Sequence, residues 1–231
     1  MREIIFDTET TGLDPKTGDR MVEIGCIEMV GRVETGRSFH AYYNPERDMP
    51  SEAERVHGLS AAFLSTKPRF AQSVDELLAF LGDAPLVAHN AGFDFSFLNN
   101  ELQLIGREVI SMERMVDTVA LARKKHPGSK LSLDALCTRY GIDRSHRVKH
   151  GALLDAELLA QVYVELTGGR QIGLGLVESE SVTIEASVGH FNSPAAAVHA
   201  VRPPRPHTAT PEELERHREF IAGIEKAIWT R

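Results

Sequence analysis

The fold is decided by the segment Glu3-Ile4-Ile5-Phe6-Asp7-Thr8-Glu9-Thr10-Thr11-Gly12, in which a short apolar run leads into acidic and hydroxylated residues. The apolar run predicts a buried strand that delivers Asp7 at its end. Because side chains alternate along a strand, Asp7 and Glu9 point to the same side. Two neighbouring carboxylates repel each other unless a cation lies between them, and hard oxygen ligands favour magnesium or manganese. The segment therefore predicts a divalent-metal site at the end of the first strand.

Outward from this segment, strand-like and helix-like patterns alternate up to about residue 169. Further strands are expected at residues 21–29, 38–43 and 85–88, since each is a short apolar run beside turn residues. Helices are expected at residues 73–81, 93–104, 132–140 and 151–166; a capping box of Ser73 and Glu76 would begin the first of them. Adjacent strands followed by strand–helix alternation predict an α/β fold with a mixed sheet flanked by helices.

A third carboxylate, Asp94, follows the fourth expected strand in the run His89-Asn90-Ala91-Gly92-Phe93-Asp94. This run predicts a strand, a turn of small residues and then the first turn of a helix. The helix dipole favours a carboxylate at that position, so Asp94 taken alone is also explained by simple stabilisation of the helix N-terminus.

A histidine and a fourth carboxylate form the pair His150-x4-Asp155. Residues five apart on one helix are about 140° apart, so the two side chains converge only if His150 lies in the loop before the helix. An exposed histidine there suits a group that takes a proton from water near neutral pH. An ordinary surface histidine and a solvated helix face are the alternatives, although Leu154 and Leu158 place Asp155 near the edge of the core.

Taken together and in this order, three segments resemble the three exonuclease motifs of the DEDDh superfamily. They are residues 7–12, residues 90–94 and residues 150–155, and all four acids and the histidine match. The resemblance covers about residues 1–169 and implies a ribonuclease H-like fold. The related tyrosine subclass needs an aspartate four residues after a tyrosine, and none of the four tyrosines has one.

The resemblance implies a 3′→5′ exonuclease that uses two divalent cations, Mg²⁺ or Mn²⁺, and releases nucleoside 5′-monophosphates. Asp7, Glu9, Asp94 and Asp155 would bind the cations, and His150 would be the general base. The terminal nucleotide would be contacted by Asp7, Glu9 and Asp155 together with Thr10, Glu52, His57 and Phe93. Packing against Phe97 explains Phe93 equally well.

Composition and charge limit the class of protein. Apolar residues make up 42% and charged residues 26% of the chain, which is globular composition, and there are two cysteines. No secretory signal or membrane-spanning stretch is visible, so a soluble protein of the bacterial cytoplasm with no membrane partner is expected. A net charge of −7 argues against a tight autonomous nucleic-acid binder. Residues 123–149 are locally basic, which suits brief contact with a delivered strand but also describes an ordinary solvated surface.

Residues 170–209 are predicted to form a short binding peptide followed by a flexible linker. The linker contains Pro194, Pro203, Pro204 and Pro206. Gln171, Leu174 and Leu176 resemble the short peptide that docks on the bacterial sliding clamp. The leucines would fill an apolar pocket, and the glutamine would supply a hydrogen bond. Because a terminal aromatic residue is absent, weak binding is expected. An ordinary apolar start to the linker is the alternative.

Residues 210–231 predict an amphipathic helix in which Thr210 and Glu213 form a capping box and Pro211 takes the first helical position. Its apolar stripe, with Trp229 as an anchor, would bind a partner rather than fold back on the exonuclease domain. The order of exonuclease motifs, clamp-like peptide, linker and helix resembles the proofreading subunits of bacterial replicative polymerases. This resemblance implies trimming of single-stranded or frayed DNA 3′ ends at the replisome, with the helix bound to the polymerase subunit. An exonuclease that trims RNA 3′ ends and a non-catalytic adaptor between clamp and polymerase remain the alternatives.

Overall fold

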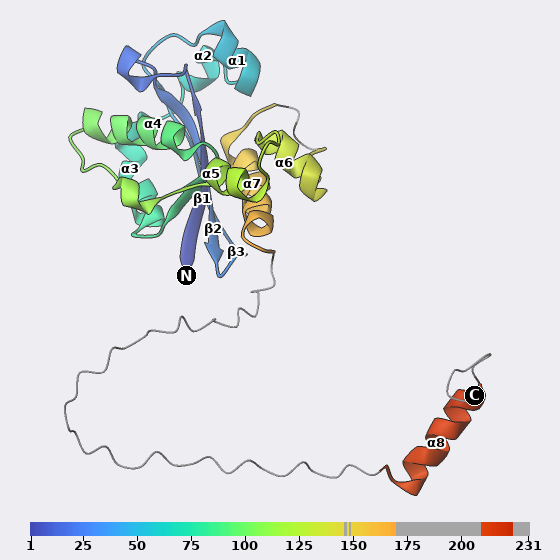
Figure 1. Ribbon diagram of the computed structural model, residues 1–231. Helices are drawn as coiled ribbons and strands as arrows, with labels where there is room; N and C mark the ends of the chain where they lie inside the picture. The colour runs from blue at the N-terminus through green and yellow to red at the C-terminus, as the bar shows by residue number, and fades with distance from the viewer. Residues whose placement is uncertain (146, 148, 170–208, 224–231) are drawn as a thin grey trace, which may run out of the picture. The chain divides into compact units, whose positions relative to one another are not determined.

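The computed structural model describes residues 1–145, 147, 149–169 and 209–223 (Figure 1). The chain divides into two units, Met1–Val177 and Glu178–Arg231, and each is described by itself.

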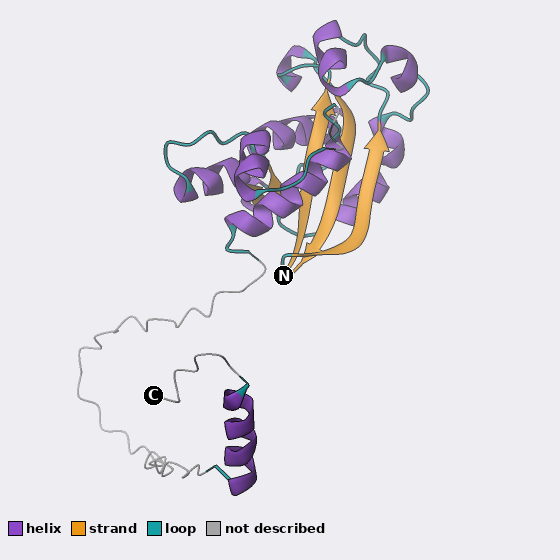
Figure 2. Cartoon of the chain, turned by 90° about the vertical axis from the view of Figure 1, so that its right-hand side faces the viewer, coloured by secondary structure: helices purple, strands orange, loops and turns teal. Residues whose placement is uncertain are grey.

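The first unit is built on a mixed sheet of five strands in the order β3-β2-β1-β4-β5. Three long strands, β1 (Arg2–Thr10), β2 (Met21–Val30) and β3 (Val33–Tyr42), pair antiparallel and lie side by side in Figure 2. Two short strands, β4 (Leu86–Ala88) and β5 (Met115–Asp117), continue the sheet in parallel. The predicted mixed sheet flanked by helices is therefore confirmed.

Three expectations about element boundaries are wrong. The strand expected at residues 38–43 begins earlier, because β3 pairs with β2 from Val33 onward. The first strand does not end at Asp7, because its pairing with β2 continues through Asp7↔Gly25 and Glu9↔Glu23. The third helix begins at Phe70 rather than Ser73, with the Gln72 side chain accepting from the Arg69 backbone N–H at 2.8 Å. Four short elements were not anticipated, because runs of eight residues or fewer carry little periodicity: α1 (Ser51–His57), α2 (Ala61–Leu64), β5 and α5 (Thr118–Lys125).

Helices cover both faces of the sheet (Figure 1). One face packs against α3 (Phe70–Leu81) and α4 (Ala91–Leu104), and the other packs against α7 (Ala152–Leu166). Outside α7 lie α5 (Thr118–Lys125) and α6 (Leu133–Tyr140). The remaining helical segments are α1 (Ser51–His57), α2 (Ala61–Leu64) and the 3₁₀ turns η1 (Pro15–Thr17) and η2 (Met112–Arg114).

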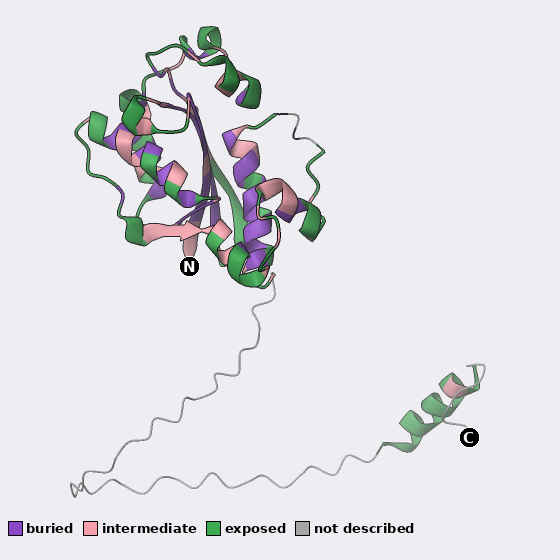
Figure 3. Cartoon of the chain, turned by 45° about the horizontal axis from the view of Figure 1, so that its top comes forward, coloured by how far each residue is buried: buried purple, intermediate pink, exposed green. Residues whose placement is uncertain are grey.

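Alternation along β1 sorts the core into two halves. Ile4 and Phe6 belong to the cluster on the α3 and α4 face, where the rings of Phe6 and Phe95 meet edge to face at 5.8 Å. Ile5 belongs to the cluster on the α7 face. Figure 3 shows β1, β2 and α7 as largely buried, whereas β3 at the edge of the sheet is mostly exposed. The same alternation directs the odd-numbered Asp7 and Glu9 toward α7 and the even-numbered Thr8 toward α4.

A single glycine sets how closely α7 approaches the sheet. A Cβ atom on Gly25 of β2 would lie 2.3 Å from the Cα and N atoms of Leu153. Backbone therefore packs directly on backbone at this point, and the first turn of α7 is brought against the strands. That turn carries Asp155.

The second unit contains α8 (Pro211–Ala222). Thr210 accepts from the Glu213 backbone N–H and Glu213 accepts from the Thr210 backbone N–H, with Pro211 at the helix start, so the predicted capping box is confirmed. The clamp-like residues Gln171, Leu174 and Leu176, the proline-containing linker and Trp229 lie outside the described residues. In the part of the chain that is described, no helix is both long and apolar enough to cross a membrane. The predicted boundaries at residues 169 and 209 stay predictions.

Candidate active site

Four carboxylates from three elements meet at one end of β1. Asp7 and Glu9 come from β1, Asp94 from the first turn of α4 and Asp155 from the first turn of α7. The pKa of Asp7 is raised well above its ordinary value, first by burial and then by repulsion from Asp94, Glu9 and Asp155. Residues far apart in the sequence therefore share one electrostatic environment, as the motif spacing predicts.

Asp94 is positioned by the strand–turn–helix junction that precedes it. Asn90 adopts a left-handed backbone conformation with φ 65°, and this turns the chain from β4 into α4. The Asp117 Oδ1 atom accepts from the backbone N–H groups of Asn90 and Ala91 at 3.1 and 3.4 Å. The Thr8 hydroxyl then donates to Asp94 Oδ1 at 2.8 Å. Asp117 and Thr8 were not anticipated from the sequence, because both act across the fold.

Burial and mutual repulsion disfavour the ionised forms of the acids. Burial, followed by repulsion from Glu23, raises the pKa of Glu9 to about 8. Burial raises the pKa of Asp94 to about 7. Glu23 stands opposite Glu9 in the sheet and is bound by His40 Nε2 at 2.7 Å. Glu23 is one of two glutamates in the mostly apolar strand at residues 21–29, and this was the sequence signal for the fifth acid.

His150 lies in the loop before α7. This is the position that allows its side chain to converge with that of Asp155. Its Nδ1 atom is 3.2 Å from Asp155 Oδ2, and its side chain is 48% exposed. Glu9, His150 and Asp155 each offer one ligand atom, and these atoms lie within 4.8 Å of one another. Oxygen donors of this kind fit a hard divalent cation. Arg147, which binds Asp155, was missed because a basic loop residue gives no sequence signal for contact with an acidic site.

A pocket of about 530 Å³ lies beside the acids. All four further residues predicted to contact the terminal nucleotide line it together with Glu9: Thr10, Glu52, His57 and Phe93. The Nδ1 atom of His57 accepts from the Leu59 backbone N–H at 3.0 Å, and its Nε2 atom is buried without a partner. Phe93 lines the pocket, and its ring centroid lies 4.9 Å from that of Phe97, so packing against Phe97 is confirmed and contact with the substrate stays a prediction. Their roles in binding stay predictions.

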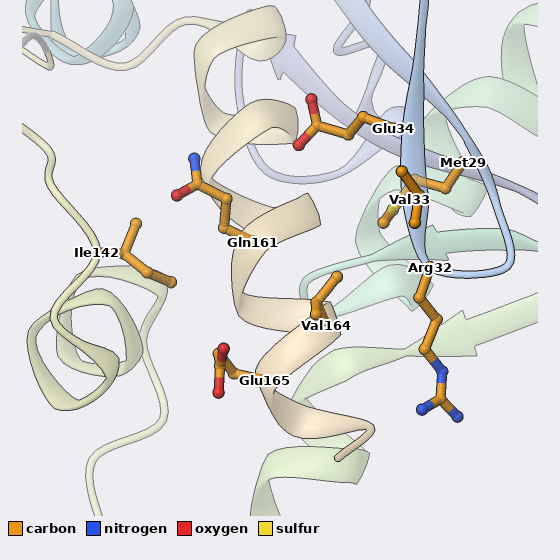
Figure 4. A pocket seen from close by; sticks show the side chains of 8 residues that line it. All are labelled: Met29, Arg32, Val33, Glu34, Ile142, Gln161, Val164 and Glu165. Carbon is orange, nitrogen blue, oxygen red and sulfur yellow. The ribbon is translucent and has the colours of Figure 1, made fainter. Parts of the chain in front are cut away.

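A second pocket, also of about 530 Å³, lies between α7 and the β2–β3 hairpin (Figure 4). Its lining includes Met29, Val33 and Val164, and it contains none of the residues predicted to act on a substrate.

A ribonuclease H-like sheet that brings four acids and a histidine together near the end of β1 is the arrangement of a 3′–5′ exonuclease. The chain belongs to the exonuclease family, whose RNase_T model matches residues 4–163. It is 50% identical over 229 residues to the DNA polymerase III subunit epsilon of Rickettsia felis, covering 98% of each chain. It is 39% identical to the DNA polymerase III subunit epsilon of Escherichia coli, covering 97% of this chain and 94% of that one. The resemblance to proofreading subunits is thereby confirmed.

A solved structure shares the fold. The nuclease domain of 3′hExo, a DEDDh family member bound to rAMP, superposes with a TM-score of 0.63 at 19% identity, over 72% of this chain and 91% of that one.

Proposed function

We propose that this chain proofreads DNA synthesis by hydrolysing the 3′-terminal phosphodiester of a mispaired strand and releasing nucleoside 5′-monophosphates. The observation that carries the proposal is the gathering of Asp7, Glu9, Asp94 and Asp155 beside a pocket, in a chain similar over nearly its full length to epsilon subunits. The same similarity supports a role at the replisome in the bacterial cytoplasm.

The four acids fit two divalent cations, Mg²⁺ or Mn²⁺. Their donors are carboxylate oxygens, which such cations prefer, and burial with mutual repulsion leaves the cluster short of positive charge. When bound, the cations supply stabilisation of the charge that develops on the phosphate.

The remaining chemistry belongs to side chains of this protein. His150 is exposed at the edge of the acids, where its imidazole takes a proton from the attacking water. The terminal nucleotide occupies the pocket next to Glu9, with the His57 Nε2–H as a donor and Phe93 as an apolar wall. Thr10 and Glu52 line the same pocket and contact the sugar or base.

The relatives' names and the tail support two proposed protein partners. The helix that begins at Pro211 binds the alpha subunit of DNA polymerase III, and residues 171–176 bind the sliding clamp weakly. The described residues of α8 fit this assignment, because Leu214 and Phe220 are exposed apolar side chains at 47% and 69%.

The deciding experiment compares a mispaired DNA primer with an otherwise equivalent RNA 3′ end. The full-length protein is used with and without EDTA. Release of nucleotides from DNA that stops with EDTA and returns with Mg²⁺ or Mn²⁺ supports proofreading. Faster trimming of RNA would favour the RNA-processing alternative, and no hydrolysis at all would favour the adaptor.

Removing the chain after residue 180 is expected to leave the nuclease intact and to abolish binding of the polymerase. All five predicted catalytic residues lie before that point, whereas the helix predicted to bind the polymerase lies beyond it. Nucleotide release and co-elution with the alpha subunit in size-exclusion chromatography measure the two properties. Co-elution of the shortened chain would contradict the assignment of the tail.

Stability is expected to depend on pH and metal together. Glu9 and Asp94 bind protons more tightly in the folded chain than their ordinary pKa values of 4.5 and 3.8 allow. Between about pH 4 and pH 8 these two side chains thus hold more protons in the folded chain than in the unfolded chain, so their contribution to the free energy of unfolding falls as pH rises. A bound cation replaces those protons and stabilises the folded state.

Melting of the metal-free protein is therefore expected about 3 °C or more lower near pH 8 than near pH 6. Saturating Mg²⁺ should raise the melting temperature by a larger amount at the higher pH. Glu9→Gln, which cannot ionise, should weaken the dependence. A melting temperature that rises with pH in the absence of metal would contradict the raised pKa values of these acids in the folded chain.

A further inference from the structure

The guanidinium group of Arg147 lies inside the acidic site. Its Nε atom donates to Asp155 Oδ1 at 2.5 Å, and its Nη2 atom donates to Asp155 Oδ2 at 2.7 Å. This two-pronged contact occupies both oxygens of a predicted metal ligand, in the geometry that makes arginine–carboxylate pairs strong. The Arg147 side chain is 10% exposed, so little water competes for it.

The same group also engages the predicted general base. Arg147 Nη2 donates to His150 Nδ1 at 2.6 Å. Because a guanidinium only donates, the Nδ1 atom must accept, which leaves the proton of a neutral imidazole on Nε2. In this arrangement His150 has no free lone pair with which to take a proton from water.

Arg147 is anchored from the other side as well. Its Nη1 atom donates to Asp134 Oδ1 at 2.8 Å, and Arg144 binds the same carboxylate at 2.8 Å. In the described ranges, no other lysine or arginine forms an ion pair with Asp7, Glu9, Asp94 or Asp155. Arg147 is therefore the cation that balances the acids in this arrangement.

We propose that Arg147 is a resident counter-cation that competes with divalent metal for Asp155, and that metal binding displaces it from both Asp155 and His150. A divalent cation bound to Asp155 would lie close to a guanidinium that donates to both oxygens of the same carboxylate, so repulsion between the two positive charges makes their binding competitive. Displacement would couple metal loading to release of the imidazole, so the base becomes free only when the site is loaded. Asp134 keeps the displaced arginine at the rim. The inference rests on the proposed metal site.

The test measures binding of Mn²⁺ alone to the full chain by calorimetry, together with melting of the metal-free protein. Arg147→Met keeps most of the side-chain volume and removes both charge and donors. It is expected to bind Mn²⁺ about tenfold more tightly, since the loss of one competing charge-assisted pair is worth about a factor of ten or more. Its metal-free form should melt several degrees lower, and saturating Mn²⁺ should remove most of that difference.

Two further variants sharpen the result. Arg147→Lys retains the charge without the fork, so its Mn²⁺ affinity should lie between the other two. Arg144→Met is the matched control, because Arg144 binds Asp134 and forms no ion pair with Asp155; its affinity should stay within about twofold of the unaltered chain. Nitrogen NMR spectra are recorded with Mg²⁺ in place of Mn²⁺. As Mg²⁺ is added, the His150 Nδ1 resonance should shift more in the unaltered chain than in Arg147→Met.

The outcomes distinguish competition by Arg147 from the existence of the proposed metal site. Equal or weaker Mn²⁺ binding by Arg147→Met, with normal binding by the unaltered chain, would overturn the competition. Absence of Mn²⁺ binding by the unaltered chain would instead overturn the proposed metal site itself.

Discussion

Asp7→Asn is expected to lower the rate of 3′-nucleotide release by about a thousandfold or more, on the scale seen when a preorganised charged group is removed from an active site. Asp7 faces Asp94, Glu9 and Asp155, so it is the acid whose loss most weakens the binding of two cations. Asparagine preserves the shape, and the sheet around residue 7 should remain paired. Release of mononucleotides from a mispaired primer measures the effect.

The same substitution carries a second expectation of opposite sign. Because burial and repulsion raise the pKa of Asp7, its ionised form costs stability in the metal-free protein. Asp7→Asn should therefore melt at or above the temperature of the unaltered chain when no metal is present. Asp48→Asn, at an exposed acid away from the cluster, serves as the control and should change neither property. Full activity of Asp7→Asn would remove the basis of the proposed function.

Gly25→Ala is expected to combine a loss of stability with a loss of activity of about a hundredfold, although Gly25 touches no substrate. The new Cβ atom would lie 2.3 Å from backbone atoms of Leu153, and backbone cannot rotate away as a side chain can. The first turn of α7 must therefore move, and Asp155 and His150 move with it. Misplacement of reacting groups by about 1 Å costs rates on this scale, and overpacking costs about 1–3 kcal/mol of stability.

Thermal unfolding and the nuclease assay together test this prediction. Gly92→Ala is the matched control for stability, because a Cβ atom there meets nothing within 4 Å and the backbone is not strained. A Gly25→Ala protein that melts like the unaltered chain and hydrolyses DNA at the same rate would show that α7 is not held at this distance.

Local sequence signals explain which parts of the fold were predictable. The long strand at residues 21–29, the helices ending at Leu104 and Leu166 and the capping box of Thr210 and Glu213 all carry their periodicity or caps in adjacent residues. The short elements α1, α2 and β5 do not, because segments of seven, four and three residues are shorter than the runs in which helical or strand periodicity can be recognised. Ser73 shows the opposite error: a valid capping pattern lies inside a helix that the chain begins earlier, at Phe70.

From the sequence, strand alternation put Asp7 and Glu9 on one face, but Asp94 and His150 taken alone had ordinary structural explanations. The resemblance of three segments to exonuclease motifs is what selected the five residues of the candidate active site. The same resemblance predicted that Thr10, Glu52, His57 and Phe93 contact the substrate, and these roles stay predictions. Only the tertiary structure decided the balance of charge around them. Glu23 stands opposite Glu9 through strand pairing, Arg147 reaches Asp155 from a loop, and Gly25 admits α7 to the sheet. Such contacts join residues far apart along the chain or in loops without periodicity, and no spacing in the sequence encodes the distance between them.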